Sequence, residues 1–141
     1  MRSYRVRRPR KHDDLLSLLK DREQGVFSTL KSALVFAAAV GFKEGKRLSF
    51  TDSGEPIAYT LFSEHKDQPF IYCLALTEYA DSSYLRNDKF LEVMQVFEEY
   101  AAGGLDVLEG YLDKSCVKES IERYLNYEDG SSVLADISGD W

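Results

Sequence analysis

Basic side chains are the most concentrated chemical feature of this sequence, and they form two groups. The first twelve residues contain no acid but several cations, namely Arg2, Arg5, Arg7, Arg8, Arg10 and Lys11. The second group is Lys43, Lys46 and Arg47. Guanidinium and ammonium groups on one face neutralise phosphates without reading base sequence, and such binding weakens steeply with salt. We therefore treat eight cations as a hypothetical DNA-backbone surface: Arg5, Arg7, Arg8, Arg10, Lys11, Lys43, Lys46 and Arg47. Two alternatives stay open, an arm that binds an acidic protein surface and an arm that only solvates the chain.

Carboxylates offer a second, enzymatic hypothesis. Asp52 is followed by Glu64 and Lys66, and many magnesium-dependent nucleases place an acid before an acid-x-lysine pair. Two carboxylates can hold a hard cation while the lysine orients the attacking water. Yet these residues fall in an expected turn and a polar loop, so a nuclease is the weaker alternative. The acid pair Glu98-Glu99 is interpreted as the solvated face of a helix.

Other catalytic or cofactor sites lack the residues that they need. The two histidines, His12 and His65, are read as solvated loop residues, which leaves neither a His-rich metal site nor a Ser-His-Asp relay. The segment 41–47 resembles a phosphate-binding loop only superficially, because its glycines are one residue too close, Arg47 replaces the magnesium-binding Ser or Thr, and a helix precedes it. We expect a protein without catalytic residues, metal or cofactor.

The charge distribution is uneven along the chain. The net charge is -6, but residues 1–77 carry 13 Lys and Arg against 9 Asp and Glu, whereas residues 78–141 carry 5 against 15. We therefore expect a basic end and an acidic end of the molecule. Cys73 and Cys116 lie in apolar helix-like stretches and are expected to be reduced core thiols, which favours a cytoplasmic protein. The longest apolar run, 33–40, is far shorter than the roughly 20 residues that span a bilayer, so we expect no membrane association.

Helix signals dominate the elements that must position these groups. Asp13 or Asp14 can cap a first helix that ends near Arg22. Ser28 is the expected N-cap of a helix over 29–44, which Gly45 ends. Because residues 33–40 are apolar on all sides, this helix is expected at the centre of the domain.

The remaining segments are predicted as follows. Short extended segments around a polar turn are expected over 47–62, and a helix is favoured over 70–79, with Pro69 in its first turn. Asp88 can cap a helix that Gly103-Gly104 ends, and the apolar stripe of this helix is Phe90, Met94, Phe97 and Ala101. A short helix over 105–112 and a last helix capped by Ser115 complete the pattern.

The predicted fold is mainly α: a compact single-domain helical bundle around a buried central helix, with a small β-hairpin-like insertion. Residues 1–12, interrupted by Pro9, are expected to form a flexible basic arm. Residues 13–127 are expected to form the globular helical domain. Residues 128–141 are expected to be a loosely ordered acidic tail, apart from docking of Trp141.

Several stretches carry a family resemblance: Arg8-Pro9-Arg10, the segments 26–31 and 34–42, Gly45-Lys46-Arg47, Gly54-Glu55-Pro56-Ile57, and Phe97 to Leu105. With these, residues 8–105 resemble the DNA phosphorothioation-associated protein 4 family of bacterial Dnd clusters. The Gly-Lys-Arg, Gly-Glu-Pro-Ile and Tyr-Ala-x-Gly-Gly-Leu pieces are the most specific.

This resemblance implies an accessory protein of a bacterial defence system in which sulphur replaces a non-bridging oxygen of the DNA backbone. It implies no reaction and supplies no catalytic residues. The preferred hypothesis is a non-enzymatic accessory protein that contacts double-stranded DNA through its basic face. The alternative is an adapter that binds other Dnd proteins.

Overall fold

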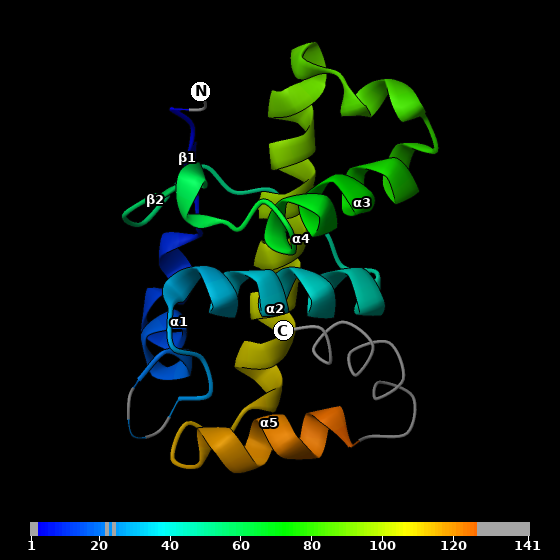
Figure 1. Cartoon of the computed structure of the whole chain (residues 1–141). Coiled ribbons are helices and arrows are strands. Elements are labelled where there is room, and N and C mark those ends of the chain that lie inside the picture. Colours follow the sequence, from blue (N-terminus) through cyan, green and yellow to red (C-terminus); the bar gives the residue numbers. More distant parts are fainter. Residues whose placement is uncertain (1–2, 22, 24, 127–141) are drawn as a thin grey trace.

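Two long helices cross at the centre of the molecule. The computed structural model describes residues 3–21, 23 and 25–126. Within it, α2 (Leu30–Glu44) crosses α4 (Phe90–Tyr111), as Figure 1 shows, and the shorter helices α1 (Asp13–Leu19), α3 (Asp67–Tyr79) and α5 (Val117–Leu125) surround this pair. The predicted mainly α fold around a buried central helix is confirmed.

Helix α2 is the expected central helix, shifted by one residue at its start. The N-cap is Thr29, whose hydroxyl accepts a hydrogen bond from the Ser32 N–H, in place of the predicted Ser28. Gly45 ends the helix with a φ of 67°, a conformation that glycine adopts without the penalty of a Cβ. Every residue from 33 to 41 is buried, so α2 packs on all its sides.

The prediction that Gly103-Gly104 ends a helix is wrong, because α4 continues through both glycines to Tyr111. Their role is close packing. A Cβ on Gly104 would lie 1.6 Å from the carbonyl oxygen of Ala37, and one on Gly103 would lie 1.9 Å from that of Lys46. The missing side chains therefore let α2 and the backbone at residue 46 lie directly against α4, and this contact offsets the low helix propensity of glycine.

The small β element joins segments that are distant in the sequence. Strand β1 (Arg5–Val6) pairs antiparallel with β2 (Ile57–Ala58), with Val6 opposite Ile57. The expected antiparallel strand pair is thus present, but its first strand comes from the N-terminus and not from the segment 47–62. Residues 3–12 therefore do not behave as the expected free arm, because Val6 is buried in the core and the 3₁₀ helix η1 (Arg10–His12) packs on α4.

The other helices lie near their predicted positions, but their ends differ. Helix α1 ends at Leu19, the predicted helix 105–112 is the last part of α4, and the N-caps of α4 and α5 are Lys89 and Cys116 in place of Asp88 and Ser115. Helix α3 has Pro69 in its first turn, and α4 buries the predicted stripe of Phe90, Met94, Phe97 and Ala101. The 3₁₀ helices η3 (Ser82–Leu85) and η4 (Asn87–Lys89) lead into α4. Both cysteines are free thiols, as expected, but Cys73 is exposed and not in the core. The predicted tail 128–141 lies outside the described residues. Within the described residues, no helix is long and apolar enough to cross a membrane.

Candidate functional site

Arg7 pairs with Glu98, the most buried carboxylate among the ion-pair partners of the candidate cations. Glu98 lies in the middle of α4 and is only 1% exposed. Its carboxylate accepts hydrogen bonds from the Arg7 side chain at 3.1 Å, from the Arg7 backbone N–H at 2.9 Å and from the Tyr4 hydroxyl at 2.6 Å. Burial raises the pKa of Glu98 above its usual value, although these bonds pull the pKa the other way.

Arg47 lies beside this pair and binds two further carboxylates. Its Nε lies 2.8 Å from Oε1 of Glu99, and its Nη1 lies 2.9 Å from Oε2 of Glu78. Glu78 also accepts a hydrogen bond from the Tyr100 hydroxyl, and burial together with this bond raises the pKa of Tyr100 to about 12. The prediction that Glu98 and Glu99 are solvated is wrong, because other segments cover α4 on the side that they occupy.

The two basic groups meet at Asp106, one turn beyond the glycines of α4. The ammonium of Lys46 lies 2.5 Å from one oxygen of Asp106, and that of Lys11 lies 3.9 Å from the other. The hydrogen bond from Lys46 lowers the pKa of Asp106. The structure thus brings Arg7 and Lys11 of the first group, and Lys46 and Arg47 of the second, to acids of one helix.

His12 is also part of this arrangement. It is 3% exposed, and its Nδ1 lies 3.0 Å from Oε1 of Glu109. The prediction of a solvated loop histidine is therefore wrong, because η1 turns the side chain onto α4. The pKa of Glu109 is lowered: its partial burial opposes the shift, but hydrogen bonds from Lys114 and His12 outweigh that burial.

The remaining candidate cations are mostly paired as well. Arg8 is buried, and its guanidinium binds Asp13 at 2.6 Å. Arg10 binds Asp52 at 2.9 Å, whereas Arg5 lies 3.9 Å from Glu55, both on the exposed surface. Lys43 is half-buried and has no ion pair within the described part of the chain.

These pairs correct the expectation of separate basic and acidic ends. Carboxylates of the acidic half, on α3 and α4, lie directly against cations of the basic half. Seven of the eight candidate cations therefore have a carboxylate within 4 Å. Because opposite charges at this range largely cancel beyond a Debye length of about 8 to 10 Å, the surface presents little net positive potential.

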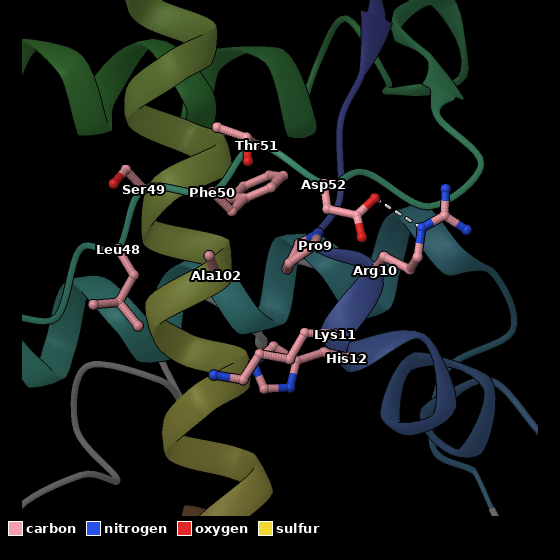
Figure 2. Close-up of a pocket in the computed structure, with 10 residues that line it drawn as sticks. All are labelled: Pro9, Arg10, Lys11, His12, Leu48, Ser49, Phe50, Thr51, Asp52 and Ala102. Atoms are coloured by element: carbon pink, nitrogen blue, oxygen red, sulfur yellow. Dashed lines mark hydrogen bonds and ion pairs between the residues drawn. The ribbon is translucent and has the colours of Figure 1, made fainter.

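A groove lies between the N-terminal segment and the segment that follows α2. Figure 2 shows residues 9–12 on one side, residues 48–52 on the other, and Ala102 of α4 at the base, with Asp52 and Arg10 paired across the edge. The cavity measures about 390 Å³. Its polar groups are largely engaged with each other, as the Arg10 backbone N–H also binds the Asp52 carbonyl oxygen at 3.0 Å.

The nuclease hypothesis finds little geometric support. Asp52 is engaged by Arg10, while Glu64 and Lys66 are exposed in the turn before α3. Across residues 3–21, 23 and 25–126, no group of three or more His, Cys, Asp or Glu side chains is placed to hold a metal ion.

Sequence reasoning missed the acids that complete this arrangement, namely Glu78, Glu98, Glu99, Asp106 and Glu109. One signal was present. Glu98 and Glu99 stand between Phe97 and the small residues 101–104, and this apolar setting is unusual for a solvated face.

A family model described as DNA sulphur modification system-associated protein 4 matches residues 5–136. Comparisons with curated proteins and with solved structures gave no match. The family match extends beyond the motifs noted in the sequence, on both sides, and it confirms the resemblance that those motifs indicated. This chain belongs to the family of DNA sulphur modification system-associated protein 4.

Proposed function

We propose that this protein is a non-enzymatic accessory component of a bacterial DNA sulphur modification system, and that it acts by binding other proteins of that system. The family description supports the association with such a system and names no reaction. The ion pairs of the candidate cations favour this adapter role over direct DNA contact.

The pairing of the candidate cations is the observation that carries this proposal. A cation that binds a phosphate must be free or must leave its carboxylate. If Arg7 and Arg47 left their ion pairs to bind phosphates, the buried acids Glu98 and Glu99 would have no cation, at a cost of a few kcal/mol for each acid. These arginines therefore stabilise the fold.

Exposed leucines are available for protein contact. Leu85 and Leu91 are 57% and 67% exposed, and both lie at the end of the molecule where η3 and η4 lead into α4 (Figure 1). Protein interfaces bury such side chains, whereas DNA backbone binding gains little from them. The test is co-purification of the tagged chain with the products of neighbouring sulphur modification genes. We expect a stable complex, and a chain that elutes alone would contradict the adapter role.

Contact with double-stranded DNA is the second candidate function. The convergence of Lys11 and Lys46 at Asp106 supports it, because two lysines that share one acid leave a net positive charge. Lys43 adds to this charge, since it has no ion pair among the residues that the structure describes. Fluorescence anisotropy with a duplex across a salt series tests it. Neutralising Lys11, Lys43 and Lys46 to Gln should flatten the log-log salt slope by about 0.9 for each lost phosphate contact. An unchanged slope would exclude this surface.

A further inference from the structure

A second cavity, beside β2, combines charge with apolar surface in a way that the ion-paired surface does not. It measures about 460 Å³ and lies where β2 meets the end of α1 and the start of α2. These elements gather on one side of the molecule in Figure 1. Its lining includes four cations, Arg5, Arg8, Lys20 and Lys31, and one acid, Glu55.

Two of these four cations, Arg5 and Lys20, can reach a ligand, although the Arg5 guanidinium also donates a hydrogen bond to the Pro56 carbonyl oxygen at 3.1 Å. Arg8 is held by Asp13, and Lys31 is held by Asp67. Lys20 is exposed and has no ion pair among the described residues. Arg5 lies 3.9 Å from Glu55, which is itself 82% exposed. A pair of this kind contributes about 0 to 1 kcal/mol, so a carboxylate ligand can replace Glu55 at little cost.

The lining also contains apolar side chains. Leu30, Pro56, Ile57 and Leu61 line the cavity, and 63% of the Leu61 surface is exposed. A leucine exposed inside a concave surface gains roughly 25 cal/mol for each Å² that a ligand covers.

We infer that this groove binds a short acidic peptide segment of a partner protein, with apolar side chains against Leu61 and carboxylates on Arg5 and Lys20. The inference rests on the proposed adapter function and names the chemistry of its partner. A nucleic acid fits less well. Two available cations would neutralise only about two phosphates, whereas duplex binders typically make 6 to 10 such contacts, and the apolar side chains of the lining offer nothing to a phosphodiester backbone.

The test uses the full chain and a dye-labelled synthetic peptide with an Asp-Leu-Asp-Leu core flanked by Gly and Ser. Binding is measured by fluorescence anisotropy. Two control peptides replace the leucines with Ser or the aspartates with Lys. We expect binding of the first peptide alone. Binding that the Ser or Lys peptide matches would overturn the inference.

Variants locate the binding to the groove. Leu61→Ser should weaken peptide binding about tenfold, and Lys20→Glu should weaken it about threefold or more. The controls are Leu48→Ser and Lys118→Glu, which change exposed residues outside this groove. All four positions are on the surface, and unchanged thermal unfolding will show that each variant folds. Equal losses in the controls would overturn the inference.

Three further outcomes are distinct. Tighter binding of a duplex oligonucleotide than of the peptide, lost in Lys20→Glu, would make the groove a nucleic-acid site and overturn the inference. If the wild-type chain co-purifies with its partner and Leu61→Ser together with Lys20→Glu leaves that complex intact, the groove assignment fails while the adapter function stands. Peptide binding without any co-purification would instead support the groove and contradict the adapter function.

Discussion

The side chain and the backbone N–H of Arg7 both bind the carboxylate of Glu98, at 3.1 and 2.9 Å. Arg7, the residue that follows β1, is thereby fixed to the middle of α4, at a residue 91 positions later in the chain. The bonds also satisfy a carboxylate that is almost fully buried. This contact explains why residues 3–12 lie against the helices, and it assigns Arg7 to the fold.

Two substitutions of Glu98 test how much its hydrogen bonds contribute to the free energy of unfolding. Glu98→Ala should lower the free energy of unfolding by about 2 to 4 kcal/mol, because it leaves the Tyr4 hydroxyl and the Arg7 N–H without their acceptor. Glu98→Gln keeps an acceptor oxygen and should cost less. Urea denaturation of both variants measures the difference. Equal losses in both would mean that the hydrogen bonds contribute nothing.

Two glycines of α4 should respond to alanine in opposite directions. Gly104→Ala places a Cβ against the Ala37 carbonyl and should destabilise the protein by about 3 kcal/mol or more. Gly110→Ala meets no atom of the described residues within 4 Å and should stabilise it by about 0.5 to 1 kcal/mol through helix propensity. Thermal unfolding checks both. A neutral Gly104→Ala would disprove the close crossing of α2 and α4.

Acid should destabilise the protein partly through Asp106. The pKa of Asp106 is lower in the folded state than in the unfolded state. Its carboxylate therefore stabilises the fold above the unfolded pKa of about 3.9, and this stabilisation is lost as the pH falls through the pKa of the folded state. Asp106→Asn should therefore reduce stability at pH 7 and flatten the loss between about pH 5 and pH 3. Urea denaturation at both pH values measures this change, and a parallel loss in both proteins would contradict it.

The ion pairs of Arg47 and Arg10 should contribute unequally to the free energy of unfolding. Arg47→Gln leaves the buried Glu99 without its cation and should cost about 2 kcal/mol. Arg10→Gln breaks a pair in which both partners are exposed and should leave stability unchanged within measurement. Parallel urea melts compare the two variants. A larger loss for Arg10→Gln would reverse the assignment of structural and surface pairs.

Local patterns were enough to predict the helices. The all-round apolarity of 33–40 predicted the buried central helix, and the stripe from Phe90 to Ala101 predicted the core face of α4. Gly103-Gly104 misled because local propensity indicates a helix end, whereas the two glycines allow close contact with Ala37 of α2 and with the Lys46 backbone, which come much earlier in the chain. Such a contact leaves no local signal.

The site was predictable only in part. The clusters of cations stood out in the sequence, but their partners are acids from distant segments, and no spacing rule links Arg7 to Glu98 or Lys46 to Asp106. His12 was assigned to a loop for the same reason. Its burial depends on η1 turning back onto α4.

The most direct test of the central claim is size-exclusion chromatography of the tagged chain, co-expressed with the neighbouring sulphur modification proteins and treated with nuclease. If the protein acts through protein contacts while its cations stabilise the fold, it will elute in a complex that survives removal of all nucleic acid. A complex that dissolves on nuclease treatment, leaving a chain that binds duplex DNA alone, would contradict the account.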